Sequence, residues 1–191
     1  QEADEAEAQK KPYRVDLLDV TARDRDSREI APKLTDLLER AEGLSYQAGS
    51  FEQALRTNGL TPADLRSGDD RDKHREVIEK SLDEANLEGL LLIDAYSGGR
   101  KLQVLGIGPE GSPVHEVKRN LRRRRRLRDA ASKEILRDVF TKLIPAIDAR
   151  RAEIAERKRR ETEERRRRQE AEEARRRAQA KAEAEAASQG E

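Results

Sequence analysis

A dense run of basic side chains is the feature of this chain best suited to binding another molecule. Eight of the eleven residues from 118 to 128 are lysine or arginine. Such groups bind carboxylates and phosphates, and they release counterions on contact with nucleic acid or an anionic membrane surface. The candidate contact residues for an anionic partner are Lys118, Arg119, Arg122, Arg123, Arg124, Arg125, Arg126 and Arg128.

Several partners fit this basic run. Residues 1–117 carry 16 basic and 25 acidic side chains, a net charge of −9, whereas residues 118–191 carry 25 and 15, a net charge of +10. The run has no interleaved aromatic residue on which a base could stack. An acidic protein partner, or pairing with the chain's own carboxylates at Asp129, Glu134 and Asp138, is therefore favoured over nucleic acid. Nucleic acid and an anionic membrane surface stay open as partners.

Acid–base or metal chemistry would need clustered carboxylates or histidines. Asp16, Asp19 and Asp94 lie on or near the ends of predicted strands and could converge on a divalent ion. No nucleophile or glycine-rich phosphate loop accompanies them, so capping or solvated aspartates are the favoured interpretation. His74 and His115 are the only histidines, and we expect both at the surface. We therefore predict a protein that is not an enzyme and has no metal or other cofactor.

Residues 106–111, GIGPEG, match the literal GxGxxG pattern of dinucleotide-binding proteins. That site needs a helix directly after the turn, with its N–H groups facing the pyrophosphate. Here Ser112-Pro113-Val114 follows, and Pro109 removes a donor from the loop. We interpret the segment as a turn between two strands. The chain has no cysteine, which excludes disulfides and thiolate metal sites.

These residues are expected to be positioned by a fold built around a central β-hairpin at residues 87–107. A short apolar run between Gly89 and Ser97 is typical of a buried strand. Gly98-Gly99 can supply the positive φ values of a tight turn, and the chain returns over residues 101–107. Alternating apolar residues predict further strands, which we place at 13–20, 44–48 and 113–117.

Amphipathic helices are predicted to cover this sheet, at residues 30–41, 51–57, 72–85 and 127–147. The last has the clearest apolar stripe, formed by Leu127, Ala131, Ile135, Val139, Leu143 and Ile147. The predicted fold class is α/β with α+β character. It is a small mixed sheet around a central hairpin, covered by amphipathic helices and followed by a long charged single helix.

Three segments are predicted. Residues 1–11 are an acidic leader that we expect to be disordered. Residues 12–148 form the α/β domain, which includes the basic run 118–128 and the capping helix 127–147. Residues 149–191 form a helical extension rich in Glu, Arg and Ala, of which some 38 helical residues would reach about 57 Å.

The extension is predicted to be a single solvated helix. It lacks the leucine or isoleucine seam of a coiled coil. Each Glu-to-Arg pair at four-residue spacing stabilises a helix by about 0.2–0.5 kcal/mol. The expected pairs are Glu153–Arg157, Glu156–Arg160, Glu161–Arg165, Glu164–Arg168 and Glu172–Arg176.

Three phrases carry a resemblance to a known fold: YRVDLLDVTA at residues 13–22, EIAPKLTDLLERA at residues 29–41 and EANLEGLLLIDAYSGGRKLQV at residues 84–104. The order of elements over residues 13–147 resembles the amino-terminal α/β domain of the TolB family and related curli-secretion-like domains of Gram-negative envelopes. Leu87-Glu88-Gly89 departs from the phrase these families have before the hairpin. No β-propeller follows, so a Tol function is not implied.

The leading hypothesis is a non-enzymatic, periplasmic interaction or scaffold domain of the bacterial envelope, joined to a charged helical spacer. It would present a sheet edge or helix face to a protein partner. A chain that starts at Gln1 fits either removal of a signal peptide or a trimmed chain. The alternative is a cytoplasmic nucleic-acid-associated protein that uses the arginine-rich segments. The least favoured hypothesis is a small metal-dependent enzyme built on the three aspartates.

Overall fold

The computed structural model describes residues 11–22, 27–121 and 127–188. It divides the chain into two compact units, residues 1–148 and residues 149–191. The predicted leader, residues 1–11, lies outside the described residues except for Lys11.

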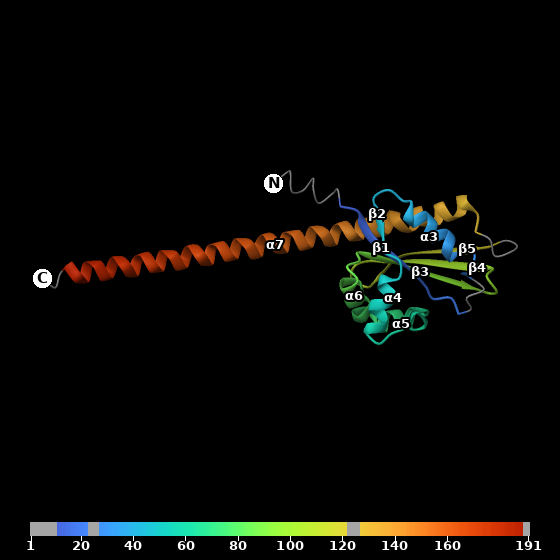
Figure 1. The fold of residues 1–191 in the computed structure, drawn as a ribbon, viewed down its shortest axis with the longest axis horizontal. Coiled ribbons are helices and arrows are strands. Elements are labelled where there is room, and N and C mark those ends of the chain that lie inside the picture. The colour runs from blue at the N-terminus through green and yellow to red at the C-terminus, as the bar shows by residue number, and fades with distance from the viewer. Residues whose placement is uncertain (1–10, 23–26, 122–126, 189–191) are drawn as a thin grey trace. The chain divides into compact units, whose positions relative to one another are not determined.

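The first unit is built on one mixed five-stranded sheet with the strand order β2-β1-β3-β4-β5 (Figure 1). β1 pairs in parallel with both β2 and β3, whereas the β3–β4 and β4–β5 pairs are antiparallel. The predicted α/β fold with a mixed sheet is confirmed. The strands are β1 (Tyr13–Asp19), β2 (Leu44–Tyr46), β3 (Gly89–Tyr96), β4 (Lys101–Ile107) and β5 (Pro113–Asn120).

Helices connect and cover these strands. The predicted single helix at residues 72–85 is wrong, because two helices meet at His74, which ends one and precedes the other. The predicted long carboxyl-terminal helix is confirmed as α7, whose residues 129–148 belong to the first unit. The helices are α3 (Ala31–Glu39), α4 (Ser50–Thr57), the 3₁₀ helix η1 (Pro62–Leu65), α5 (Gly68–Lys73), α6 (Arg75–Glu84) and α7 (Asp129–Ser188).

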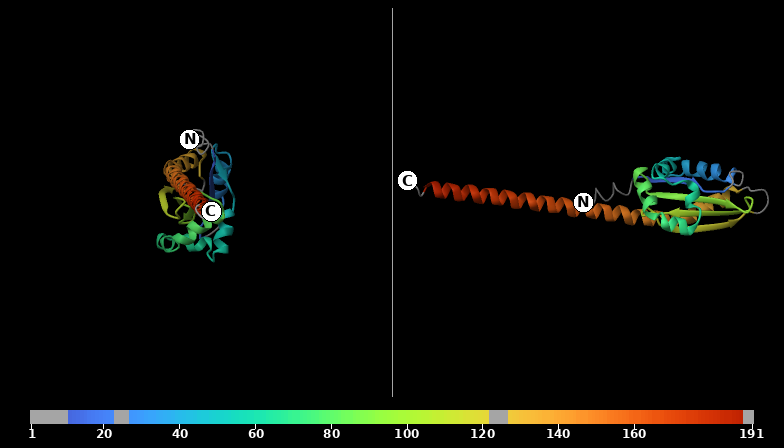
Figure 2. Two further views of the ribbon diagram at one scale, coloured as in Figure 1. Left: turned by 90° about the vertical axis from the view of Figure 1, so that its left-hand side faces the viewer. Right: turned by 90° about the horizontal axis from the view of Figure 1, so that it is seen from below.

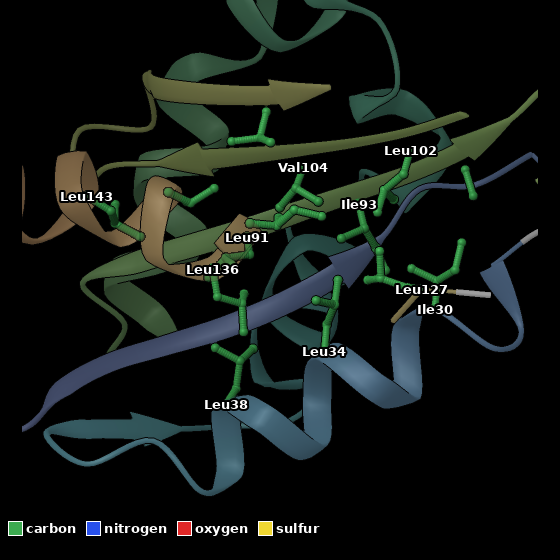
Figure 3. Close-up of a cluster of buried hydrophobic side chains, with 14 of the residues drawn as sticks. Ile30, Leu34, Leu38, Leu91, Ile93, Leu102, Val104, Leu127, Leu136 and Leu143 are labelled. Carbon is green, nitrogen blue, oxygen red and sulfur yellow. The ribbon is translucent and has the colours of Figure 1, made fainter. Parts of the chain in front are cut away.

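The sheet is covered on both faces, which gives the domain two apolar cores (Figures 1 and 2). The first lies between the sheet and helices α3 and α7 (Figure 3). The second lies between the opposite face and α4, η1 and α6. Because side chains alternate along a strand, β3 sends Leu91 and Ile93 into the first core and Leu90 and Leu92 into the second. This two-sided burial explains why the first half of β3, residues 90–93, is an unbroken apolar run.

The predicted central hairpin is confirmed. β3 pairs with β4 from Leu90 to Tyr96, and the turn between the two strands contains Gly98 and Gly99 at φ +70° and +73°. The loop predicted to start at residue 106 starts later, because Gly106 and Ile107 still belong to β4. Gly106 has a packing reason to be glycine, since a Cβ there would come within 2.8 Å of Val139 on α7.

Candidate functional site

β5 is one of the two outer strands of the sheet, and its backbone pairing shows which groups point outward. The prediction that it ends at residue 117 is wrong, because it continues to Asn120. The Leu121 N–H donates to the Arg100 carbonyl oxygen at 2.7 Å, in register with the β4–β5 ladder. Hydrogen-bonded and non-hydrogen-bonded pairs alternate in an antiparallel ladder. The backbone groups of Glu116, Lys118 and Asn120 therefore point away from β4.

The side chains of β5 divide between the two faces of the sheet. Val117 is buried in the core under α7, whereas Glu116, Lys118 and Asn120 are exposed on the opposite face. The Lys118 ammonium lies 2.8 Å from the Glu116 carboxylate, and this hydrogen bond raises the pKa of Lys118 above its ordinary value. Glu116 also accepts a hydrogen bond from Gln103 on β4. The outer side of β5 thus carries one positive and one negative charge, two residues apart.

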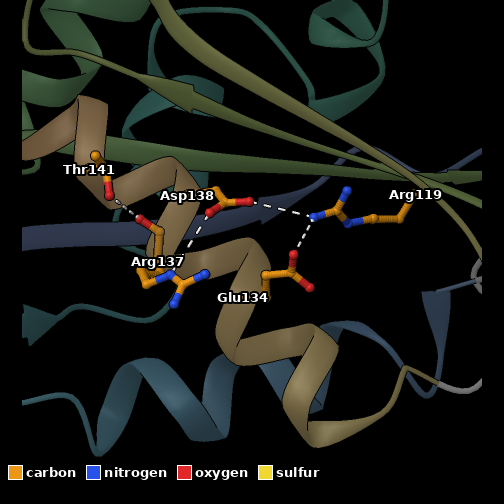
Figure 4. A network of polar contacts seen from close by, with 5 residues as sticks. All are labelled: Arg119, Glu134, Arg137, Asp138 and Thr141. Carbon is orange, nitrogen blue, oxygen red and sulfur yellow. Dashed lines mark hydrogen bonds and ion pairs between the residues drawn. The ribbon is translucent and has the colours of Figure 1, made fainter.

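Arg119 faces the other way and joins β5 to α7 (Figure 4). Its guanidinium lies 3.0 Å from the Glu134 carboxylate and 3.5 Å from that of Asp138. The predicted pairing of the basic run with the protein's own carboxylates is confirmed for these two acids. Asp129 lies 2.5 Å from the Lys33 ammonium, and its pairing with residues 122–126 of the run lies outside what the structure describes.

The basic run is therefore not a single binding face over the part that the structure describes. Lys118 and Arg119 are neighbours on a strand, so their side chains lie on opposite faces of the sheet. Arg128 is exposed, and its carbonyl oxygen accepts hydrogen bonds from the backbone and hydroxyl of Ser132 in the first turn of α7. The remaining candidates, Arg122, Arg123, Arg124, Arg125 and Arg126, lie outside the described residues.

Asp16 caps a helix. Its side chain, 1% exposed, accepts hydrogen bonds from the backbone N–H groups of Gly49 at 3.3 Å and Phe51 at 2.9 Å, at the start of α4. Burial raises the pKa of Asp16, although these hydrogen bonds act in the opposite direction. A carboxylate at a helix N-terminus satisfies N–H groups that have no partner within the helix. Asp16 thus has the capping role that the sequence favoured.

Asp19 ends β1, and Asp94 lies near the carboxyl end of β3, where the chain order of the sheet reverses. In α/β sheets such a point is a common place for ligands. Asp19 accepts a hydrogen bond from the Thr21 N–H at 2.9 Å, and the Arg66 Nε donates to the Val20 carbonyl oxygen at 2.8 Å. Burial raises the pKa of Asp94, with Arg66 acting against that rise.

The three aspartates do not form the divalent-ion site that was the less favoured interpretation of the sequence. Asp16 is engaged with α4, and Asp19 with the turn that follows β1. Among the residues that the structure describes, no three His, Cys, Asp or Glu side chains gather in a way that could hold a metal ion.

The two histidines and the glycine-rich segment were the other candidates for a chemical site. His74 joins α5 to α6 and His115 lies on β5, and both are half-buried rather than fully exposed. The glycine-rich segment is a turn, in which the Gly108 N–H donates to the Ser112 carbonyl oxygen at 2.9 Å. β5 follows it directly, so the helix that a dinucleotide would need is missing at that point.

Sequence reasoning missed the edge positions Glu116, Lys118 and Asn120 as a group. The prediction concentrated on the arginines of the basic run. The signal for the edge strand was instead the alternation of exposed and buried residues, which starts before residue 118. No helix in the described ranges is long and apolar enough to cross a membrane. Comparison of the chain with family models, with curated proteins and with solved structures finds no match.

Proposed function

We propose that this chain is a non-enzymatic interaction domain that contacts a protein partner along the outer edge of β5, with residues 149–188 as a charged helical spacer. The observation that carries the proposal is the eight-residue edge strand β5. Its outward backbone groups at Glu116, Lys118 and Asn120 have no neighbouring strand among the residues that the structure describes. Such groups are a template for an added strand.

The charges of β5 favour a protein over nucleic acid. Lys118 is paired with Glu116, and Arg119 with Glu134 and Asp138, so the described basic side chains of the strand are compensated within the domain. Phosphate binding depends on uncompensated positive charge. An extended peptide instead uses the backbone and tolerates a mixed charge pattern. The envelope location follows from the resemblance to the TolB-family domain and remains part of this proposal.

The second unit has the properties of a spacer. Every side chain from residue 155 to residue 179 is exposed, so no face of this stretch is covered by other described residues. Three predicted ion pairs are present, Glu156–Arg160, Glu164–Arg168 and Glu172–Arg176. Glu153 instead pairs with Arg150, and Glu161 with Arg157. Such pairs hold a helix without a partner helix, and a helical linker is a semi-rigid spacer.

Photo-crosslinking in cells tests the proposal. A benzoylphenylalanine at Asn120 would lie on the outer side of β5, and one at Asp69, exposed on α5, serves as the matched control. We expect a discrete higher-mass adduct from position 120 and none from position 69. Absence of an adduct at position 120, or equal adducts at both positions, would overturn the proposal.

A further inference from the structure

We infer that the partner of the β5 edge is a second copy of this chain, whose β5 pairs antiparallel to the first about a two-fold axis at Val117. This inference rests on the proposed function and names the partner. The two sheets would join into one continuous sheet across the axis. A two-fold interface uses the same patch on both copies, so the edge must be complementary to itself.

The backbone allows only some registers. The outward-pointing groups belong to Glu116, Lys118 and Asn120, so these residues must lie opposite outward-pointing residues of the other strand. With the axis at Val117, Glu116 lies opposite Lys118 of the partner subunit, and Lys118 lies opposite Glu116 of the partner subunit. Both cross-strand pairs then bring together opposite charges, which stabilise antiparallel pairing.

The two adjacent registers are disfavoured by charge. With the axis at Lys118, the two lysines of the edge would lie directly opposite each other. With the axis at Glu116, the two glutamates would do so. Like charges directly opposite across strands are destabilising. The alternation of one glutamate and one lysine therefore selects a single register among those nearest the axis.

The α7 face of the strand is compatible with the same register. Val117, 7% exposed, would lie opposite Val117 of the partner subunit, which extends the apolar core across the axis. Arg119 would lie opposite His115 of the partner subunit. The charge of Arg119 is already compensated by Glu134 and Asp138 of its own chain, so this contact places no uncompensated guanidinium at the interface.

Charged edge residues usually prevent strands from adding to a sheet, and lysine is the commonest device. A lysine alone would have that effect on β5. The glutamate two residues before it changes the outcome, because each lysine then meets a carboxylate in the register described above. The same charges disfavour a foreign strand that lacks this alternation, which gives the edge specificity.

A charge swap in the full chain tests this inference. Glu116→Lys leaves two lysines on the edge, and Lys118→Glu leaves two glutamates, so each variant alone would place like charges opposite each other. By sedimentation equilibrium we expect the unaltered chain to dimerise and each single variant to dimerise roughly tenfold more weakly or worse. An equimolar mixture of the two variants, and the double variant Glu116→Lys/Lys118→Glu, should both recover the dimer.

Loss of folding would not imitate this pattern. The two side chains are exposed, and a surface ion pair contributes little to folding stability. Circular dichroism of each variant checks that the fold is kept, and recovery in the mixture excludes misfolding of the single variants. A chain that stays monomeric at all concentrations, or a dimer that ignores both charge reversals, overturns the inference. If Asn120 then crosslinks to a different protein, the proposed function survives and only the second copy is excluded.

Discussion

The guanidinium of Arg119 lies 3.0 Å from the carboxylate of Glu134, and this contact fastens the outer strand of the sheet to the helix that covers it. β5 is held in the sheet by β4 on one side only, so its position depends on such contacts more than that of an inner strand does. The same contact compensates the positive charge of Arg119, whose side chain lies on the α7 face of the sheet. The outer edge then carries the opposite charges of Glu116 and Lys118, two residues apart.

Replacement of Arg119 tests this fastening role. Arg119→Ala should lower the free energy of unfolding by about 0.5–1 kcal/mol, because the side chain is partly exposed and its two ion pairs are only partly shielded from water. Urea unfolding measures the loss, which should shrink at high salt. Lys142→Ala, at an exposed position on α7, is the matched control and should have little effect. Equal losses for both variants would show that the contact does not fasten β5.

Removal of the Asp16 carboxylate should damage the domain more severely. Asp16→Ala leaves the N–H groups of Gly49 and Phe51 without their acceptor at the start of α4. Loss of a helix cap together with unsatisfied buried donors should cost about 2–3 kcal/mol of unfolding free energy. Chemical denaturation at neutral pH measures this change. A loss no larger than that for Arg119→Ala would contradict the capping role.

The pH dependence at Asp16 follows from the direction of its shift. Burial raises its pKa in the folded state above the ordinary 3.8, so the folded protein binds this proton more tightly than the unfolded chain does. The stability contribution of Asp16 is then greatest below pH 3.8 and falls as the pH rises through the folded-state pKa. Asp16→Asn removes this titration. The stability difference between the unaltered chain and Asp16→Asn should therefore decrease with rising pH across that window.

The turn before β5 depends on a close contact at Gly111. This glycine has φ +71°, and a Cβ there would come within 2.5 Å of the Arg75 carbonyl oxygen on α6. Gly111→Ala should therefore destabilise the domain by about 2 kcal/mol or more, since a backbone clash adds to the cost of the left-handed conformation. Gly59, at φ +82° with open space around its Cβ position, is the matched control.

Thermal unfolding of the two glycine variants separates these costs. Gly59→Ala should show only the conformational cost, about 1 kcal/mol. If the two variants lose the same stability, the contact between the turn and α6 does not matter for the fold.

Much of the domain was predictable because its core elements carry strong local patterns. The apolar run of β3, the glycines of its turn and the apolar stripe at the start of α7 each specify one structure without help from distant residues. The alternation around Tyr13 likewise gave β1 correctly. These segments bury their apolar side chains in the two cores, so pattern and environment agree.

The features that were not predicted depend on contacts between residues that are distant in sequence. The cap of α4 comes from Asp16, which precedes that helix by a whole β-α-β unit, so inspection of residues around Ser50 could not find it. The end of β5 is charged because it lies at the edge of the sheet, and such residues are typical of loops as well as of edge strands. The break at His74 has no glycine or proline to mark it.

The spacer role predicts a fixed distance along the second unit. The chain has no cysteine, so Ala152→Cys and Ala178→Cys allow two spin labels to be placed without side reactions. At about 1.5 Å per residue, the backbone positions should lie about 39 Å apart. Pulsed electron paramagnetic resonance should give one narrow distance distribution in the full chain, when labelled protein is diluted with unlabelled protein.

A proline provides the control for this distance. Arg165→Pro interrupts the helix between the two labels and should broaden the distribution. A broad distribution in the unaltered sequence would mean that the second unit is not a rigid spacer.

Amide hydrogen exchange along β5 tests the central claim most directly, because it reports which backbone groups of the edge are engaged. In the dilute, free protein, the amides of Val117 and Arg119 should exchange slowly, whereas those of Glu116, Lys118 and Asn120 should exchange quickly. In the complex with the partner that crosslinks to position 120, the three fast amides should become protected while the slow ones change little. Fast exchange at these three amides in the complex would contradict the account.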